Sequence, residues 1–293
     1  AFPTVLIKTE QAHYRFSSYH GAIESAILLK EQFHQREKNA ETGVPAERFS
    51  DGPLNLVTTW DAPFLPLQFR FTQLNPDPEV RRVVRTGVPI ILFGDSPGQM
   101  GVRVGKSPDP ADEAIPLLPG DLFRGADGTV LGSIQGSGAG GVHQFIAIPG
   151  VTVSSGNRSV DVVRVGPFSS VFQSDPRFRV MTSPEGTARF LWPDARRDTS
   201  PLTIERLYRT KADYEIETIL RFYWEGAKPL KHREDLVLYG WAGEDMEEPS
   251  MLNPAPNVIQ PACGIGDSTE HADRDEADPT YHGAADWAGI EFR

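Results

Sequence analysis

The chain contains one cysteine, Cys263, in 293 residues. A single cysteine cannot form a disulfide within the chain, so the fold must depend on a packed apolar core, which a chain of this length can build. The sequence also lacks a run of about 18 apolar residues, the length that predicts a transmembrane helix. Its first residues, Ala1-Phe2-Pro3, do not resemble a signal peptide. We therefore expect a soluble protein, or a soluble piece of a larger one.

Basic residues are in the minority, with 29 Lys and Arg against 40 Asp and Glu, and the formal net charge is -11. Nucleic-acid-binding proteins present basic patches to phosphate groups, and proteins that dock on anionic lipid do the same. The acidic balance therefore predicts no nucleic-acid partner and no direct lipid binding. An acidic surface of this kind keeps a protein soluble.

Proline and glycine are abundant, with 25 and 27 residues respectively. Both residues interrupt regular structure, so this composition favours many turns and long loops over long helices. Hydrophobic residues make up 39% of the chain, which is enough for a core, and they occur in short runs punctuated by turn residues. We predict an all-β fold of antiparallel strands with little helix, in a single domain over residues 1–293.

The clearest pattern is a β-meander over Leu202–Trp241. Thr203–Thr210 reads as its first strand, and Tyr214–Trp224 alternates over eleven residues, with Ile219 as the exception. This period of two buries one face of a strand and exposes the other. A turn at Gly226-Ala227-Lys228-Pro229 leads to a return strand at Asp235–Trp241.

The long alternation of Tyr214–Trp224 makes two structural predictions. We expect the meander to be central in its sheet, because this strand has the longest regular alternation of the chain. We also expect Leu220 and Phe222 to be buried in the core.

The remaining chain reads as short strands separated by two irregular stretches. Gly94–Gly150 is dominated by Gly, Pro and Asp and is predicted to be a Gly/Pro-rich insertion of loops. Ala242–Pro279 is acidic and is predicted to be a solvated excursion. Ala22–Phe33 fits a helix or a strand equally well by periodicity. Further predicted strands are Leu54–Trp60, Leu67–Phe71, Val80–Arg85, Val88–Phe93, Phe145–Ile148, Val151–Ser154, Val160–Val165, Phe168–Phe172, Arg177–Thr182 and Ala188–Trp192.

The meander resembles part of the periplasmic domain of the YidC membrane-protein insertase family. In that family a long strand is followed by a Gly-Asp-Tyr turn, a second strand and an Asn-x-Gly-x-Lys-Pro-Leu connection. Ala212-Asp213-Tyr214 and Glu225-Gly226-Ala227-Lys228-Pro229-Leu230 occupy those places here. The resemblance involves no enzymatic motif.

Two further blocks resemble the same family and follow in its order. Val5-Leu6-Ile7-Lys8-Thr9-Glu10 and Gly21–Leu28 match the family's opening strands and Gly-containing turn, which favours a strand in Ala22–Phe33. Gly283–Arg293 resembles the Gly-Trp segment that precedes the second transmembrane helix. The three blocks, about Thr4–Phe33, Ala188–Trp241 and Gly283–Arg293, cover roughly a third of the chain.

The resemblance implies a galactose-mutarotase-like β-supersandwich, with two antiparallel sheets packed face to face. It also implies a periplasmic domain of a bacterial inner-membrane protein, which assists membrane-protein insertion as a non-catalytic accessory without a cofactor. Its partners would be accessory subunits of the Sec translocon and nascent membrane proteins. As a fragment, the domain is expected to be monomeric.

The return of the meander is the expected partner-binding region. An extended segment can add to an exposed sheet edge, and apolar side chains then anchor it. The family's contact with the Sec accessory subunit falls in this part of the domain. The candidate residues are Lys231, Arg233, Glu234, Leu236, Leu238 and Tyr239.

Two motifs invite a chemical interpretation that their surroundings do not support. Gly136–Gly141 contains GxGxxG, but a dinucleotide site needs a helix after those glycines, and Val142–Pro149 reads as a strand. A hairpin loop is the better prediction. Cys263, His271 and His282 lie at spacings that match no zinc motif, so no metal site is expected there.

A carbohydrate-binding or mutarotase-like supersandwich is the alternative function. Trp192, Trp224 and Trp241 could stack on sugar rings, although packing in a core is the commoner role of such residues. Mutarotation needs a general acid and a general base. His143, His232 and Glu234 are the only candidates near predicted strands, and no feature singles them out. We therefore predict no catalytic residue and no enzymatic activity.

Overall fold

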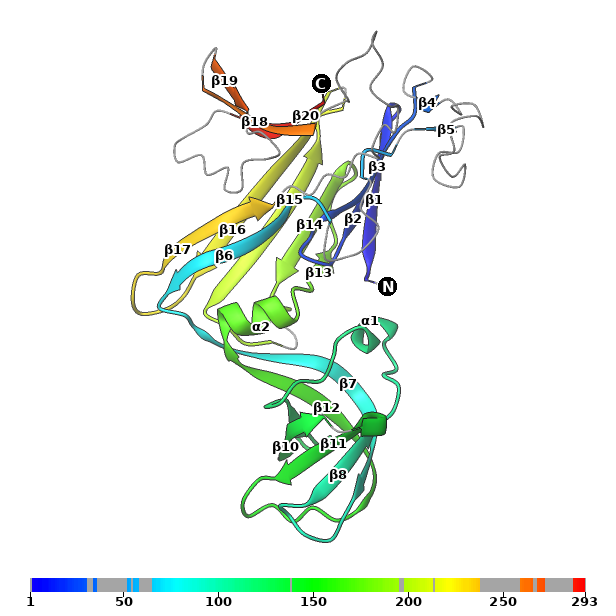
Figure 1. Ribbon diagram of the computed structural model, residues 1–293, viewed down its shortest axis with the longest axis vertical. Coiled ribbons are helices and arrows are strands. Elements are labelled where there is room, and N and C mark those ends of the chain that lie inside the picture. Colours follow the sequence, from blue (N-terminus) through cyan, green and yellow to red (C-terminus); the bar gives the residue numbers. More distant parts are fainter. Residues whose placement is uncertain are drawn as a thin grey trace, which may run out of the picture. The chain divides into compact units, whose positions relative to one another are not determined.

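The structure is a computed structural model, described here for residues 2–30, 34–35, 52–53, 55–57, 65–137, 139–194, 198–212, 214–237, 259–265, 268–271 and 287–292. These residues form antiparallel β-strands and two short α-helices (Figure 1). The predicted all-β antiparallel fold with little helix is confirmed. Both helices are much too short to cross a membrane.

The chain divides into two compact units. The first comprises Ala1–Ile7, Phe16–Gly21 and Phe69–Asp235, and the second comprises Lys8–Arg15, Ala22–Gln68 and Leu236–Arg293. Each unit is described by itself below.

The first unit contains a closed barrel with the strand order β10-β11-β8-β7-β12-β9. Strand β9 pairs with both β10 and β12 and so closes the barrel, which leaves it without a free edge. Helix α1 (Pro110–Glu113) lies between β8 and β9 in the sequence. The strands are β7 (Glu79–Phe93), β8 (Met100–Val104), β9 (Leu122–Arg124), β10 (Val130–Ser137), β11 (Val142–Ala147) and β12 (Gly156–Pro167).

Alternate residues of these strands fill the barrel, because successive side chains of a strand point to opposite faces. Phe123 and Phe145 stack inside it with their ring centroids 5.6 Å apart. The ring of Phe145 also lies against Gly132, where a Cβ atom would come within 2.3 Å of it. The buried core consists of Val84, Val88, Ile90, Leu92, Met100, Val102, Ile115, Phe123, Leu131, Ile134, Phe145, Ala147, Val160 and Val162.

The Gly/Pro-rich stretch Gly94–Gly150 is not the series of loops that its composition suggests. It contributes β8, β9, β10 and β11 to the barrel. These strands are short and lie between turns rich in Gly, Pro and Asp, so the composition of the whole stretch conceals them. The two strands predicted at Val80–Arg85 and Val88–Phe93 are one continuous strand, β7, with Gly87 at positive φ between them.

A four-stranded sheet follows the barrel in sequence and belongs to the same unit. Its order is β13-β14-β15-β16, formed by Arg179–Met181, Thr187–Trp192, Leu202–Thr210 and Ile216–Trp224. Strand β15 is buried on both faces over most of its length. Phe190, Trp192, Ile204 and Tyr208 lie on one side of the sheet and are fully buried.

The structure corrects the prediction that the meander, with Tyr214–Trp224 as its longest strand, is central in its sheet. Strand β16 stands at one end of the order of its sheet, and β14 and β15 are the internal strands. Leu220 and Phe222 are accordingly only partly buried. An alternating pattern indicates that one face of a strand is covered, but it does not indicate how many strands flank that strand.

The return strand of the meander also differs from its prediction. It is β17 (Lys231–Val237), which begins before Asp235. Among the described strands it pairs with β6 (Gln68–Asn75) instead of β16. The rings of Phe71 and His232 contact Phe222 at centroid distances of 5.7 and 4.8 Å. Residues 238–241 lie outside the described residues.

The segment Phe168–Phe172, predicted to be a strand, is helix α2 (Phe168–Ser174). Pro167 precedes its first residue, which is a favourable place for proline because the first turn needs no backbone donor there. Phe168, Val171 and Phe172 have helical spacing and are buried. In so short a segment, an apolar run of this kind does not distinguish a helix from a strand. Val151–Ser154, also predicted to be a strand, forms none.

Strands β1 (Thr4–Lys8), β2 (Ala12–Ser17) and β3 (Ile23–Leu28) form a sheet in that order, and the boundary between the units runs through β1 and β2. The strand predicted within Ala22–Phe33 is confirmed. In the second unit, the side chain of Asn55 accepts hydrogen bonds from the backbone N–H groups of Ala26 and Val57 at 3.0 and 3.1 Å.

The second unit also contains a sheet with the order β19-β18-β20. Its strands are Ser268–His271, Ile259–Ile265 and Trp287–Phe292 respectively. The acidic stretch Ala242–Pro279, predicted to be a solvated excursion, therefore includes two paired strands. The unit further contains the short pair β4 (His34–Gln35) and β5 (Gly52–Pro53).

The turn at His20-Gly21 packs closely on β15 within the first unit. Both residues have positive φ angles, 53° and 61°. A Cβ atom on Gly21 would lie 3.1 Å from Cδ of Arg206. Arg206 donates a hydrogen bond from Nη1 to the His20 carbonyl at 2.8 Å, and the Tyr208 hydroxyl donates one to the Gly21 carbonyl. This turn therefore requires glycine, both for its backbone angle and for its contact.

We expect Gly21→Ala to lower the free energy of unfolding by about 1–3 kcal/mol, because the new methyl group adds a close contact to an unfavourable φ. Gly140→Ala is the matched control, since Gly140 has a φ of 71° but nothing within 4 Å of its would-be Cβ. Urea denaturation of both variants measures the difference. An equal loss in the two variants would mean that the approach of Arg206 does not constrain the turn.

Candidate functional site

The predicted partner-binding residues lie on or beyond β17. Lys231 and Arg233 are exposed, and Glu234 is half-buried, with its Oε2 atom 2.7 Å from Nδ1 of His232. The hydroxyl of Thr72 on β6 donates to the Arg233 carbonyl at 3.3 Å, which supports the pairing of the two strands.

The apolar anchors predicted for this region are not described at side-chain level. Leu236 lies within β17, while Leu238 and Tyr239 fall outside the described residues. The structure therefore places the charged half of the predicted set on one exposed strand and leaves the apolar half untested.

A network of buried ion pairs is the most elaborate polar arrangement among the described residues. Arg82 on β7 is 3% exposed, and its Nε atom lies 3.0 Å from Oδ2 of Asp175 and 3.4 Å from Oδ2 of Asp198. It also donates to the backbone carbonyls of Asp175 and Arg177. Arg177 in turn pairs with Asp112 of α1. The network thus connects the barrel to the segments that flank β13 and β14.

A second buried pair lies beside the first. Arg164 on β12 binds Asp121 with two parallel hydrogen bonds of 2.7 and 2.8 Å. The same guanidinium donates to the Pro116 carbonyl and to the Ser174 hydroxyl at 2.8 and 3.0 Å. Fork-like pairing of this kind satisfies both charged groups, which is what a buried ion pair requires.

A cavity of about 220 Å³ opens onto this network. Arg82, Arg177 and Arg179 contribute positive charge to its wall, and Asp109, Asp194 and Asp198 contribute negative charge. Arg179 pairs with Asp194 at 3.2 Å, so the charges of the wall are largely satisfied internally. Because three arginines and three aspartates balance each other's charge, the arrangement favours a structural junction over a site for a charged ligand.

Asp198 has an unusual protonation equilibrium in this junction. Burial raises its pKa to about 6, against the opposing effects of Arg82 and of hydrogen bonds from the backbone N–H groups of Val83 and Asp194. A folded-state pKa above the unfolded value means that the folded protein holds a proton that the unfolded chain has lost. Between about pH 4 and pH 6, Asp198 therefore lowers the free energy of unfolding as the pH rises.

We expect Asp198→Asn to remove this contribution. Plotted against pH, the difference in free energy of unfolding between wild type and variant should change by up to about 3 kcal/mol from pH 4 to pH 6, with the wild type losing relative stability as the pH rises. Wild type and variant must be compared at each pH because both contain buried His20, whose pKa is lowered to about 3 mainly by burial. In both proteins His20 makes the free energy of unfolding rise with pH, which is opposite to the effect of Asp198. A constant difference across this range would contradict the raised pKa of Asp198.

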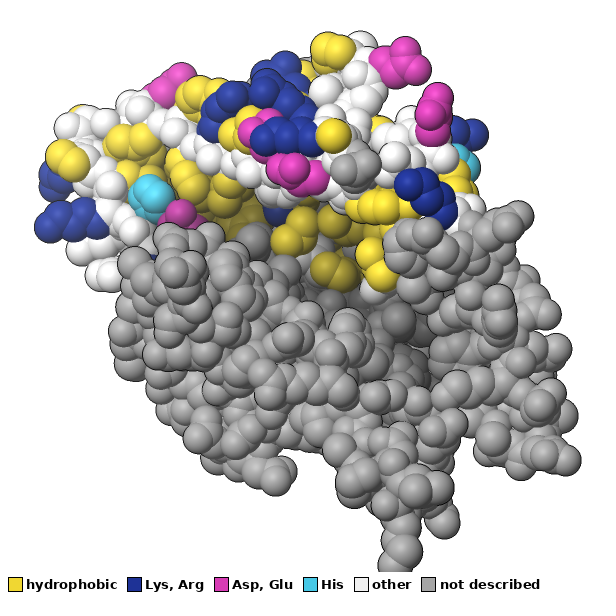
Figure 2. Space-filling model, turned by 90° about the horizontal axis from the view of Figure 1, so that it is seen from above, with side chains coloured by type: hydrophobic (Ala, Val, Ile, Leu, Met, Phe, Trp, Pro, Cys, Tyr) yellow, Lys and Arg dark blue, Asp and Glu magenta, His cyan; other side chains and the backbone are white. Residues whose placement is uncertain are grey.

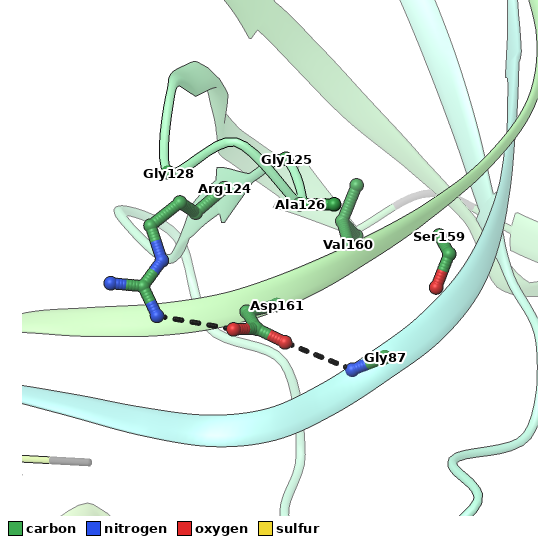
Figure 3. A pocket seen from close by; sticks show the side chains of 8 residues that line it. All are labelled: Gly87, Arg124, Gly125, Ala126, Gly128, Ser159, Val160 and Asp161. Atoms are coloured by element: carbon green, nitrogen blue, oxygen red, sulfur yellow. Dashed lines mark hydrogen bonds and ion pairs between the residues drawn. The ribbon is translucent and has the colours of Figure 1, made fainter. Parts of the chain in front are cut away.

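A smaller pocket of about 200 Å³ lies on the barrel (Figure 3). Asp161 of β12 accepts hydrogen bonds there from the Gly87 backbone at 3.0 Å and from Arg124 of β9 at 3.1 Å. The rim is formed by the glycine turn Gly125–Gly128, which offers no large apolar side chain. Because both oxygens of Asp161 are engaged by the barrel itself, the arrangement ties β7, β9 and β12 together.

The Gly-rich motif is a hairpin connection, as predicted. Gly136 and Ser137 end β10, and a short 3₁₀ turn at Ala139–Gly141 leads directly into β11. Cys263 lies on β18 opposite Glu270, His271 lies on β19, and His282 is outside the described residues. Within the described part of the chain, no group of three His, Cys, Asp or Glu residues has metal-binding geometry.

The aromatic and histidine candidates for a sugar site are dispersed. Trp192 is completely buried, and the rings of Phe168 and Phe172 contact it at centroid distances of 4.6 and 5.1 Å. Trp224 covers Gly226 in the following turn and donates to the Lys228 carbonyl at 2.6 Å. Trp241 lies outside the described residues. His143 is on β11 of the barrel, whereas His232 and Glu234 are on β17.

The sequence interpretation missed the buried arginines, although a signal was present. Arg82 lies between Val80 and Val84 on the apolar phase of β7, and Arg206 lies between Ile204 and Tyr208 on that of β15. A charged residue in the apolar phase of a strand indicates either a buried ion pair or a break in the pattern.

The surface is more varied in charge than the net value suggests. Seen from above, the described part of the molecule carries Lys and Arg side chains gathered beside Asp and Glu side chains (Figure 2). Local basic surface therefore exists on a chain whose formal net charge is -11.

Comparison with known proteins identifies no relative. No family model matches the chain, and no curated protein and no solved structure matches it either.

Proposed function

We propose that this chain is a periplasmic accessory domain of a YidC-type membrane-protein insertase. In this role it is a non-catalytic β module that presents strands and sheet faces to accessory subunits of the Sec translocon or to nascent membrane proteins. The proposal rests on the three sequence blocks that resemble the family in its own order.

One structural observation carries the proposal beyond the sequence pattern. The turn at Gly21, from the first block, packs on Arg206 and Tyr208 of the second block, far away in the sequence. The ring of Phe16 stacks on Tyr208 with the centroids 4.2 Å apart, and both residues are buried. Residues of the two blocks thus share one core within the first unit, which supports reading the two blocks together.

The sugar-binding alternative has no observation in its favour. Trp192 has no exposed surface on which a sugar ring could stack, and Trp224 is engaged by its own hairpin turn. The two candidate tryptophans that the structure describes are accounted for by packing.

Site-specific photo-crosslinking in the full-length protein tests the proposal. A photoreactive amino acid at Lys231 or Arg233, both exposed on β17, should crosslink to translocon components or to a nascent membrane protein in intact membranes. Asp127, exposed in the glycine turn of the barrel, is the matched control position. Crosslinks to these partners from Asp127 but from neither β17 position would place the interface elsewhere, and their absence from every surface position would overturn the proposal.

A further inference from the structure

The outward side of the four-stranded sheet carries an exposed cluster of two arginines and a tyrosine. Glu205 of β15 pairs directly with Arg221 of β16, and Thr203 pairs with Tyr223, so these residues share one face. Arg189 of β14 joins them through a contact with Glu205. The fully buried residues Phe190, Ile204 and Tyr208 fall on the opposite face, which makes this the outer side of the sheet.

Glu205 is the buried centre of the cluster. Its side chain is 3% exposed, and it accepts hydrogen bonds from Nη1 of Arg221 at 3.0 Å, from the Tyr223 hydroxyl at 2.8 Å and from Nε of Arg189. Burial alone raises the pKa of Glu205, but these three hydrogen bonds outweigh it and lower the pKa below its ordinary value. The carboxylate therefore stays ionised and fixes three side chains above it.

The three surrounding side chains remain accessible. Arg189 and Arg221 each have 43% of the side chain exposed, and Tyr223 is 48% exposed. Each guanidinium has five N–H donors, and the contact with Glu205 engages Nε of Arg189 and Nη1 of Arg221. Further donors on both arginines are thus available at the surface, in positions that Glu205 has already ordered.

The charge of the cluster is positive, because two guanidinium groups share one carboxylate. The neighbouring charges on this face pair with each other: Arg209 lies 3.7 Å from Glu217, and Arg179 lies 3.2 Å from Asp194. Among the described residues, Arg189 and Arg221 therefore carry one more positive charge than Glu205 balances, on a chain whose formal net charge is -11.

We infer that this face binds an acidic, extended segment of a partner protein, with a carboxylate of that segment seated between Arg189 and Arg221 and its backbone lying against Tyr223. Arginine forks recognise carboxylates through paired hydrogen bonds, and arginine and tyrosine dominate the energetics of protein interfaces. Pre-ordered side chains lose less entropy on binding. A membrane fits less well, since a chain with a net charge of -11 is repelled as a whole by anionic lipid.

This inference concerns a different surface from β17 and does not depend on the insertase proposal. The test uses a fluorescein-labelled peptide in which Asp and Glu alternate with Gly and Ser. Its binding to the protein is measured by fluorescence anisotropy at low salt. A peptide with Asn and Gln in place of Asp and Glu is the neutral comparison. Vesicles of phosphatidylglycerol form the membrane arm.

Arg189→Gln/Arg221→Gln is the decisive variant. We expect it to weaken binding of the acidic peptide about tenfold or more, which corresponds to about 1.4 kcal/mol. The double variant leaves the buried carboxylate of Glu205 without a cation. A triple variant that also carries Glu205→Gln is therefore measured beside it, and the triple variant should bind the peptide equally weakly. Arg81→Gln/Arg103→Gln removes the same charge from other exposed positions and should change binding less than about twofold.

Three results would overturn the inference. The first is equal binding of the acidic and neutral peptides, and the second is unchanged binding by a folded triple variant. The third is binding to phosphatidylglycerol vesicles without binding to the acidic peptide, which would identify a lipid surface instead.

Discussion

Arg82→Met is expected to lower the free energy of unfolding by about 3–5 kcal/mol, since removing one partner of a buried ion pair leaves the other charge without compensation. The guanidinium of Arg82 is the shared cation of Asp175 and Asp198 and also donates to two backbone carbonyls. It lies over the Trp192 ring as well, 5.2 Å from the centroid. Methionine replaces the packing of the side chain but none of these polar contacts.

Arg81→Met is the matched control for this effect. Arg81 is the preceding residue on the same strand and is exposed, so its loss should change the free energy of unfolding by less than about 0.5 kcal/mol. Arg82→Met/Asp198→Asn should recover part of the loss, because one of the two uncompensated carboxylates is then removed. Chemical denaturation near neutral pH measures all three variants. A loss below about 1 kcal/mol for Arg82→Met would show that the buried network does not stabilise the junction.

Phe145→Ala is expected to cost about 3–5 kcal/mol, the range for removing a large aromatic side chain from a packed core. Phe145 is fully buried in the barrel, stacks on Phe123 and fills the space above Gly132. Gly132 has no side chain that could fill that space. A cavity would therefore remain.

Gln144→Ala provides the comparison, since Gln144 precedes Phe145 on β11 and is exposed. Its effect should be close to zero. Thermal and urea unfolding of both variants would measure the contribution of the barrel. If Phe145→Ala were as mild as Gln144→Ala, the stretch Gly94–Gly150 would not contain the packed core described here.

Local patterns predicted the strands well where alternation was long. Strands β14, β15 and β16 fall where the sequence places them, and so does β3 within a segment whose periodicity alone was ambiguous. Helix α2 was mistaken for a strand because Phe168–Phe172 is too short for its periodicity to be distinctive. The barrel was missed because closure depends on pairings between distant strands, such as β9 with β12, which no local pattern contains.

The candidate sites were harder to predict than the strands. Lys231 and Arg233 were predicted to face solvent ahead of a return strand at Asp235–Trp241, and the structure has them exposed within β17. The cluster at Glu205 could not be foreseen, because it depends on the register that brings Arg221 opposite Glu205 across two strands. Buried networks such as that of Arg82 join residues of several elements, and only the folded chain brings them together.

The sequence of the gene on either side of the segment that encodes Ala1–Arg293 tests the central claim most directly. A YidC-type insertase requires one transmembrane helix before this domain and a bundle of transmembrane helices after it. We expect the coding sequence to continue in both directions with those hydrophobic segments, each about 20 residues long. A coding sequence that supplies a cleavable signal peptide directly before Ala1 and a stop codon directly after Arg293 would contradict the insertase proposal.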